Sequence, residues 1–332
     1  GDLTGYAGYK WLSMNYLLVN EKELTQVRMA TNDGDVVEKN WANVPLQRNY
    51  RTNILGNILT SSVDFNIVIE PAFTDDLEPE VTSVATVADL ETAIANATKP
   101  TVIEVEPGTY TFSQIKVPSG KNITLVETAS TRSAQGVTFD GQFFVTGELY
   151  LDGVTINNAN ATSEGISKSK DNAIYVQGQG KVVVTNSTFN ITKATGITSW
   201  WSTGNSDEQT EIIVKNCVFN ANGHRPIQAE AHLTVENCTF NDQYRYCAQL
   251  TCSDAVINFK NNTIVNGENG KAFVYGIQLE GADYGCNDCV INGSGNTIVD
   301  GGADSTMYYC ECGKVVHETI EWNVETTPVH EN

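Results

Sequence analysis

The chain has 332 residues, and its 40 acidic and 20 basic side chains leave a net charge of −20 at pH 7. Hydrophobic residues make up 40% of it, enough for a packed core, which excludes global disorder. The acidic excess argues against nucleic acid or an anionic membrane as partner, and no apolar run reaches the roughly 18 residues that a membrane helix needs. The length favours two domains or one elongated repeat array.

The chain up to residue 79 alternates apolar and polar residues as half-buried strands do. Residues 9–19 and 62–69 both have this period of two. The acidic, proline-flanked stretch 71–79 has the composition of a linker. We therefore predict that residues 1–79 form part of an antiparallel β-sandwich. Its large core side chains would be Trp11, Tyr16, Trp41 and Phe65.

Two segments of this part carry a family resemblance. YKWLSMNYLLV (9–19) and VPLQRNYRTNILGNILTSSVDFNIVIEPAF (44–73), with its RNYRTNI core, resemble the C-terminal half of the fimbrillin-like surface proteins of Bacteroidetes. The resemblance implies export, usually as a lipoprotein, to the outer-membrane surface or the extracellular space. It also implies a role in adhesion or pili, with another fimbrial subunit as an assembly partner.

The second domain is predicted to span residues 80–332 and to begin with a helix near 86–96. Thr86 is a helix-capping residue, Asp89 stands three positions later, and apolar residues follow at helical spacing. The strand and turn VIEVEPGTY (102–110) come next. A short helix before I-x-V-x-P-G-x-Y resembles the N-terminal cap of right-handed parallel β-helices.

A repeat follows. Four segments align without gaps: VTNSTFN (184–190), VKNCVFN (214–220), VENCTFN (235–241) and FKNNTIV (259–265). A fixed core at irregular spacing predicts one coil of a parallel β-helix per repeat, with insertions in loops. We expect the third residue of each segment to point inward and to form a ladder that binds neighbouring backbone. These residues are Asn186, Asn216, Asn237 and Asn261. The alternative is a β-sandwich with recurrent turn asparagines.

A second set of aligned segments precedes the first. It comprises FFVTG (143–147), AIYVQG (173–178), GITSWW (196–201), PIQAEA (226–231), CAQLTC (247–252), GIQLEG (276–281) and MYYCEC (307–312). Because alternate strand residues face opposite sides, two outward rows are predicted. One row is Tyr175, Thr198, Gln228, Gln249, Gln278 and Tyr309; the other is Gln177, Trp200, Glu230, Thr251, Glu280 and Glu311.

The fold class expected from these patterns is all-β. We predict a right-handed parallel β-helix of about seven or eight coils. It resembles the pectin-lyase-like fold over about residues 84–325. In that family this first strand of each coil carries the substrate groove.

The outward rows combine aromatic, amide and acidic side chains, which suits glycans because flat rings stack on sugars and carboxylates accept hydroxyl hydrogen bonds. The candidate binding residues are Tyr175, Gln177, Trp200, Trp201, His224, Arg225, Gln228, Glu230, Tyr244, Arg245, Gln249, Gln278 and Glu280. The Trp200-Trp201 pair is the most telling, since large exposed aromatics are uncommon on a purely structural face. The alternative is a solvated sheet whose side chains merely stack.

Two functions fit such a face. We favour a non-catalytic adhesin or glycan-binding protein, whose partner is a polysaccharide, a host glycan or another surface protein. The alternative is a polysaccharide lyase or glycoside hydrolase. Glu230 and Glu280 would lie roughly 10 Å apart, two coils at about 4.8 Å each, which is too far to share one Ca²⁺. That distance is near the upper end for inverting glycosidases, about 6.5–9.5 Å. We assign no catalytic residue and expect no cofactor.

All eight cysteines lie between Cys217 and Cys312. Cys217 and Cys238 occupy the same place in successive repeats, so we expect them to stack inward, close enough for a disulfide. The pairs Cys286-x-x-Cys289 and Cys310-x-Cys312 are compatible with zinc or with disulfides. We favour the reading without a metal.

If residues 71–79 are a linker between two folded parts, limited proteolysis should cut near residues 74–79 and release a stable C-terminal fragment, because exposed linkers are cleaved first. Mass spectrometry of the fragments tests this, and protection of the segment would contradict it.

Overall fold

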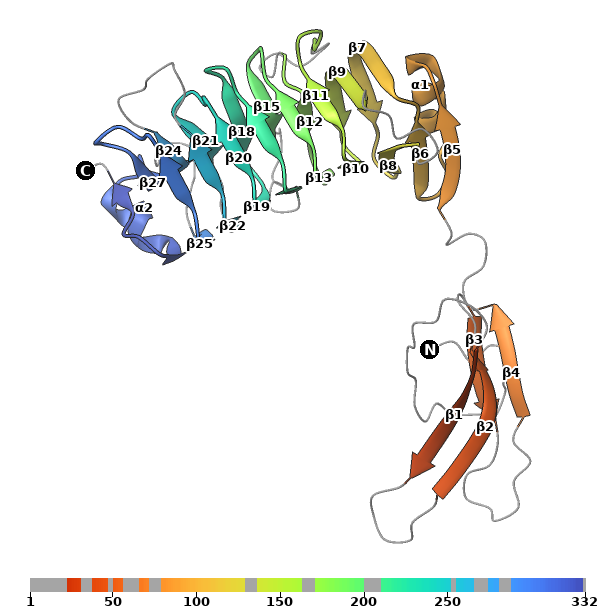
Figure 1. Cartoon of the computed structure of the whole chain (residues 1–332). Helices are drawn as coiled ribbons and strands as arrows, with labels where there is room; N and C mark the ends of the chain where they lie inside the picture. Colours follow the sequence, from red (N-terminus) through yellow and green to blue (C-terminus); the bar gives the residue numbers. More distant parts are fainter. Residues whose placement is uncertain are drawn as a thin grey trace. The chain divides into compact units, whose positions relative to one another are not determined.

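Figure 1 shows the computed structural model of the chain. It divides into two compact units, residues 1–78 and 79–332. The residues described are 23–30, 38–46, 50–55, 66–71, 79–128, 136–162, 171–199, 210–251, 255–265, 274–280 and 288–330.

The first unit contains two antiparallel strand pairs among its described residues. One pair is β1 (Glu23–Ala30) with β2 (Glu38–Leu46), and the other is β3 (Tyr50–Leu55) with β4 (Asn66–Pro71). Val44 on β2 is buried. The predicted strand at 9–19, the core candidates Trp11, Tyr16 and Phe65, and the linker 72–78 lie outside the described residues. The sandwich therefore stays a prediction.

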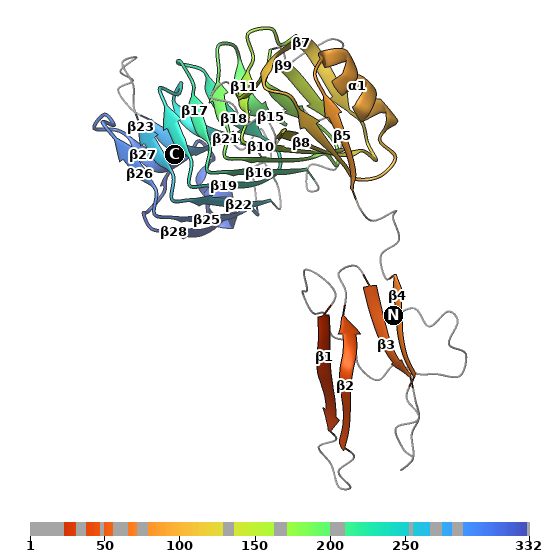
Figure 2. The same cartoon turned by 45° about the vertical axis from the view of Figure 1, so that its right-hand side comes forward.

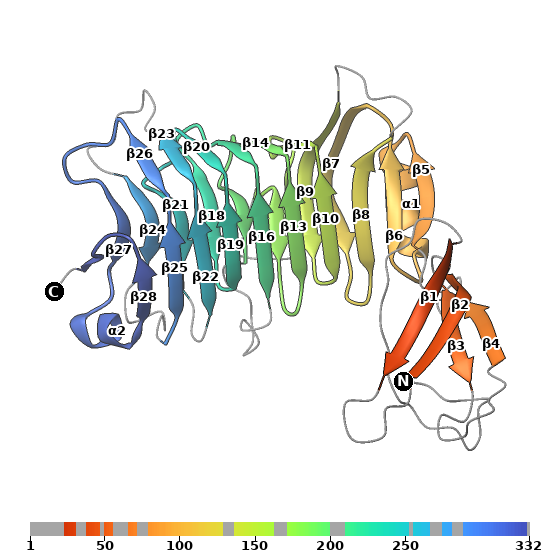
Figure 3. The ribbon, with the colours of Figure 1, turned by 60° about the horizontal axis from the view of Figure 1, so that its bottom comes forward.

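The second unit is a parallel β-helix in which each coil contributes up to three short strands. One wall is a ten-stranded sheet, seen face-on in Figure 3. From the N-terminal end its strands are β5 (Glu80–Val84), β6 (Thr101–Val105), β8 (Asn122–Glu127), β10 (Glu148–Asp152), β13 (Lys181–Thr185), β16 (Glu211–Lys215), β19 (His232–Glu236), β22 (Val256–Lys260), β25 (Val290–Ser294) and β28 (Glu321–Val324). The first coils of the β-helix lack the asparagine motif. The sequence repeat therefore predicts fewer coils than this sheet has strands.

The other sheet has two arms that meet at β9 (Val137–Val145), and β7 (Gly108–Val117) pairs with β9. The first arm contains β11 (Thr155–Asn157), β14 (Thr188–Asn190), β17 (Val218–Asn220), β20 (Thr239–Asn241), β23 (Thr263–Val265) and β26 (Thr297–Val299). The second contains β12 (Ile174–Val176), β15 (Thr195–Thr198), β18 (Arg225–Ala229), β21 (Tyr246–Leu250), β24 (Tyr275–Leu279), β27 (Thr306–Cys310) and β29 (Val329–His330).

Two helices belong to this unit. Helix α1 (Val87–Asn96) lies beside β5 and β7 at its N-terminal end (Figure 2). The Asp89 backbone N–H donates to Thr86 Oγ1 at 3.1 Å, so the cap satisfies one orphan donor of the first turn. Leu90 and Ile94 are buried against the core. The short helix α2 (Lys314–Thr319) lies near the C-terminal end.

The core is built from equivalent side chains of successive coils. Strands β13, β16 and β19 alternate half-buried and buried residues, as a wall with one wet face requires. The rings of Phe189 and Phe219 stack at 4.5 Å between centroids, and those of Phe219 and Phe240 at 4.9 Å. Because the stacking repeats down the helix, each ring is buried by its own equivalents.

The structure corrects the orientation of the motif asparagines. Asn186, Asn216, Asn237 and Asn261 do occupy one turn of successive coils, but each is exposed and has φ between 52° and 56°. Gly153 and Gly295 take the same place in neighbouring coils with φ of 68° and 70°. The predicted inward orientation is wrong because this turn needs a left-handed backbone, which Asn and Gly tolerate best.

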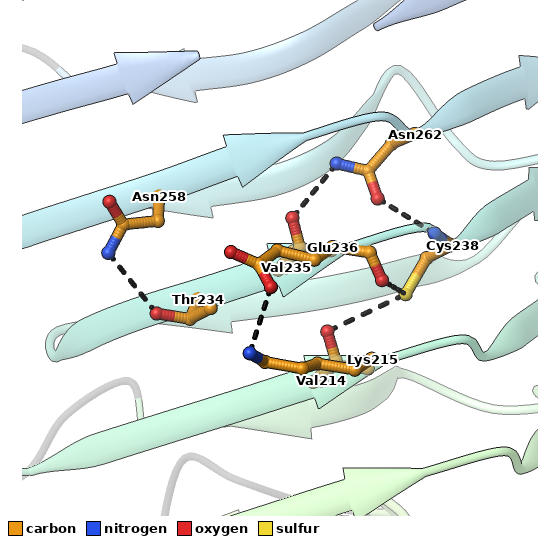
Figure 4. A network of polar contacts seen from close by, with 8 residues as sticks. All are labelled: Val214, Lys215, Thr234, Val235, Glu236, Cys238, Asn258 and Asn262. Atoms are coloured by element: carbon orange, nitrogen blue, oxygen red, sulfur yellow. Dashed lines mark hydrogen bonds and ion pairs between the residues drawn. The ribbon is translucent and has the colours of Figure 1, made fainter. Parts of the chain in front are cut away.

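The inward position at this turn is the next residue of each motif. Ser187, Cys217, Cys238 and Asn262 fill it, and all four are buried. Asn262 binds backbone there: its Oδ1 accepts from the Cys238 N–H at 2.9 Å and its Nδ2 donates to the Val235 carbonyl at 3.0 Å (Figure 4). On the outer side of this wall, Lys215 of β16 and Glu236 of β19 form an ion pair at 2.8 Å.

An asparagine ladder does exist, one strand further along the motif. Each side-chain amide donates to the carbonyl oxygen of the asparagine one coil earlier, at 2.8–3.0 Å. The ladder runs through Asn157, Asn190, Asn220 and Asn241. Its sequence signal is the asparagine that ends three of the four motifs.

The left-handed turn predicts how substitutions at Asn216 behave. Asn216→Leu should lower the free energy of unfolding by about 1–2 kcal/mol, because a branched side chain is strained at positive φ. Asn216→Gly should stay within about 0.5 kcal/mol of the wild type. Urea denaturation of the two variants measures the difference. Equal losses would instead assign the effect to the 3.2 Å hydrogen bond from Asn216 Nδ2 to Asn186 Oδ1.

Candidate functional site

The candidate site is the outer surface of β12, β15, β18, β21, β24 and β27. It includes the residue that comes directly after each of these strands. We call this surface the polar face. The strand registers pair Thr198 with Gln228, Gln228 with Gln249, Gln249 with Gln278, and Gln278 with Tyr309. The first predicted outward row is therefore one column of side chains.

Burial changes the role of this first row. Tyr175 is 0% exposed, Gln249 6% and Gln278 5%, and the Tyr175 ring stacks on Phe144 with centroids 5.6 Å apart. Gln228 is half-buried. Tyr175 therefore offers no open ring for a sugar, contrary to the expectation from alternation. Alternation assigns a side chain to a face of the sheet, but it does not say whether that face reaches solvent.

The glutamine amides in the column bind one another. Gln228 Nε2 donates to Gln249 Oε1 at 2.6 Å, and Gln249 Nε2 donates to Glu280 Oε1. Tyr246 Oη also donates to Gln249 Oε1, at 2.6 Å. Thr195 Oγ1 donates to Gln228 Oε1 at 3.3 Å. Each bond satisfies a polar group that burial would otherwise leave costly, so this network is held in one arrangement.

A cationic cluster borders the network. Arg225 Nε donates to Tyr246 Oη at 2.7 Å, and burial raises the pKa of Tyr246 to about 12, so its hydroxyl keeps the proton that it donates. The guanidinium carbons of Arg225 and Arg245 lie 5.1 and 5.4 Å from the centroid of the Tyr244 ring. Cation–π attraction at these distances holds Tyr244 between the β18 and β21 coils.

Acidic side chains form the second row. Glu230 accepts from Thr251 Oγ1 at 3.1 Å, and its backbone N–H donates to Ser199 Oγ at 2.7 Å. Glu280 is half-buried, and Glu311, which follows the neighbouring strand, is exposed. Burial and, secondly, the negative charge of Glu311 raise the pKa of Glu280. The carboxylates of Glu280 and Glu311 therefore repel each other across neighbouring coils.

The remaining predicted residues lie as follows. Gln177 and His224 are half-buried, Gln177 just beyond β12 and His224 in the turn before β18. Trp200 and Trp201 lie outside the described residues. The sequence also marks the loop YRY (244–246) beside the face, but residue spacing does not show that Tyr246 is buried and hydrogen-bonded to Arg225 and Gln249.

The cysteines that the structure describes lie in the core. Cys217, Cys238 and Cys247 are buried free thiols, Cys289 is buried as well, and Cys310 and Cys312 form a disulfide. Cys252 and Cys286 lie outside the described residues. Within the described ranges, no three His, Cys, Asp or Glu side chains are grouped so that they could hold a metal ion. Nor is any described helix long and apolar enough to cross a membrane.

Family models match two segments of the chain. Residues 148–311 match a right handed beta helix region, which confirms the right-handed parallel β-helix predicted from the repeat. Residues 4–113 match a family of unknown function (DUF6562), a segment that extends past the first unit into α1 and β7. The fimbrillin-like resemblance stays a prediction.

Other comparisons add little. None of the curated proteins matches the sequence. A crystal structure of the pectin methylesterase from Aspergillus niger, in deglycosylated form, is similar with a TM-score of 0.36 at 12% identity. That alignment covers 76% of this chain and 91% of the esterase. A likeness of this size supports no conclusion about activity.

The raised pKa of Glu280 has a consequence for stability. A carboxyl whose pKa is raised by folding destabilises the folded state once it ionises, so this penalty grows as the pH rises through that pKa. Glu280→Gln removes the charge and keeps an acceptor for Gln249. The free energy of unfolding of this variant, relative to the wild type, should therefore be higher at about pH 7 than at about pH 4.

Urea denaturation at both pH values measures this change. Glu91→Gln, which removes an exposed carboxylate from α1, is the matched control and should show a smaller difference between the two pH values. A Glu280→Gln variant that behaves like Glu91→Gln would contradict the buried, repelled carboxylate.

Proposed function

We propose that the polar face binds a carbohydrate and that the protein is a non-catalytic glycan-binding protein. The observation that carries the proposal is the hydrogen-bonded row from Arg225 through Tyr246 and Gln249 to Glu280, which spans three neighbouring coils. A polar row already held in place loses little freedom on binding, which favours affinity. The column that contains Gln249 places one polar side chain on each successive coil, which suits a ligand that is itself a chain of similar units.

The contacts proposed for the ligand differ from those expected from the sequence. Gln228 and Gln249 are engaged with each other, so they orient their neighbours. The groups in reach of a ligand are the half-buried Tyr244 and Glu280 and the exposed Arg245 and Glu311. Basic and acidic groups both border the face, which suits a polar ligand with many hydroxyls.

The setting of this activity is also a proposal. The fimbrillin-like resemblance of segments 9–19 and 44–73 supports an exported surface protein in which the β-helix presents the binding face. A polysaccharide, a host glycan or another surface protein would then be its partner, and a fimbrial subunit could assemble with it.

A second candidate, glycoside hydrolysis, is favoured by one observation. Glu280 has a raised pKa, as a general acid requires, and Glu311 is a second carboxylate one coil away, at a strand spacing of about 4.8 Å. Retaining enzymes hold their two carboxyl groups about 5–5.5 Å apart. In this reading Glu280 would protonate the departing glycosidic oxygen while Glu311 attacks the sugar carbon.

The two candidates separate in one experiment. Pectins, host glycans and mucins are screened against the full chain, with binding and the release of new reducing or unsaturated ends scored separately. The binding proposal predicts retention of a glycan without release. Turnover by the wild type that disappears in Glu280→Gln would establish the hydrolase instead.

For a glycan that binds, Arg245→Ala should weaken affinity by about tenfold, because Arg is prominent among residues that dominate interface energy. Lys314→Ala, which removes an exposed cation from α2, is the matched control and should leave affinity unchanged. Isothermal titration calorimetry gives both values. Equal affinity of Arg245→Ala and wild type would show that the ligand binds elsewhere.

A further inference from the structure

The amide ladder of the polar face is interrupted at Gln278. The side chain of Gln278 follows Gln249 in the column, so the pattern set by Gln228 predicts a bond from Gln249 Nε2 to Gln278 Oε1. Gln249 instead donates to Glu280. Gln278 is 5% exposed, and its Oε1 is buried without any hydrogen-bond partner among the described residues. An unsatisfied buried acceptor is costly, and in a native structure it calls for an explanation.

The surroundings of this oxygen are rich in acceptors. Glu280 lies two residues later on the same face of the chain, and Glu311 lies beside Glu280 on the next coil. A carboxylate can only accept hydrogen bonds. Glu280 receives one donor from Gln249, and the repulsion of Glu311 keeps the pair electrostatically unfavourable. Arg225 offsets this only in part, because its own bonds hold it at Tyr246 and Tyr244.

Aromatic rings complete the environment. Tyr309 is next to Gln278 in the column, and its ring stacks on Tyr275 with centroids 4.2 Å apart and planes 8° apart. The negative face of such a ring attracts a cation, whereas its positive edge does not. Because Glu311 is exposed, the group formed by Gln278, Glu280 and Glu311 reaches solvent at Glu311.

We propose that Gln278, Glu280 and Glu311 form a subsite for a protonated amine, such as the ammonium group of an amino sugar. This inference rests on the proposed glycan binding and specifies its ligand class. An ammonium has three donors and no acceptor, which matches one amide oxygen and two carboxylates. A neutral hydroxyl could satisfy Gln278 but would leave the two carboxylates repelling each other. A bound ammonium would donate a hydrogen bond to Gln278 Oε1. Its positive charge would at the same time offset the repulsion between Glu280 and Glu311.

The first test compares three matched tetrasaccharides by isothermal titration calorimetry: glucosamine, N-acetylglucosamine and glucose, each β-1,4-linked. The wild type should bind the glucosamine tetramer at least about tenfold more tightly than the other two, the size of effect expected of charged hydrogen bonds. Raising the pH until the amine is neutral should abolish the preference.

Variants assign the preference to the subsite. Glu280→Gln should reduce the affinity for the glucosamine tetramer about tenfold and that for the glucose tetramer much less, because only the amine loses a charged acceptor. Glu91→Gln makes the same change in net charge away from the face, so it controls for general attraction to this acidic protein.

Gln278→Met separates a role in binding from a role in stability, because its melting temperature and its affinity for the amine should change in different directions. Removing an unsatisfied buried acceptor should keep or raise the melting temperature while weakening amine binding. Gln249→Met removes a satisfied member of the ladder and should lower the melting temperature. If Gln278→Met also lowers it, Gln278 is bonded in the folded protein and the proposal is wrong.

The remaining outcomes are decisive as well. Equal binding of all three tetramers leaves glycan binding intact and overturns the amine subsite. No binding of any glycan in this experiment or in the wider screen overturns both. Equal losses in Glu280→Gln and Glu91→Gln would reduce the preference to general electrostatics. Calcium binding that Glu280→Gln abolishes would show that the acceptors hold a metal ion.

Discussion

The structure depends on in-register hydrogen bonding between successive coils. Each inner strand of the β-helix pairs in parallel with the equivalent strands before and after it, so the nearest neighbours of a side chain are its own equivalents. Columns of like residues result, and each column must be favourable as a stack. Phenylalanines meet this requirement by ring stacking, and asparagines meet it because an amide both donates and accepts.

The same constraint shapes the polar face. Gln228 and Gln249 satisfy each other across coils, which lets Gln249 be buried without loss. Residues with only one kind of hydrogen-bonding group cannot do this. Stacked carboxylates such as Glu280 and Glu311 repel, which contributes to the raised pKa of Glu280. A column of amides therefore stabilises the wall, while a column of acids leaves a charge for something else to neutralise.

These two columns meet at Gln278. Gln249 Nε2 donates to Glu280 and not to Gln278. The buried oxygen Oε1 of Gln278 therefore has no donor among the described residues. The polar face thus combines a rigid part, from Arg225 to Gln249, with an unsatisfied part beside it. A ladder that served packing alone would have continued through Gln278, and departures from such local rules are expected at functional sites.

The sequence by itself determined the repeat and predicted the β-helix and its columns, because an ungapped motif at irregular spacing stacks in register when each copy forms one coil. It also marked Asn216 and its equivalents as one turn. Only the tertiary structure decided that these asparagines face outward, since a left-handed backbone is not visible in residue spacing. Likewise, alternation put Tyr175 and Gln249 on the outer face, but their burial depends on what covers that face, which spacing does not encode. The partner of each amide was equally undetermined, because Gln249 had two acceptors in reach, and only the three-dimensional arrangement selected Glu280.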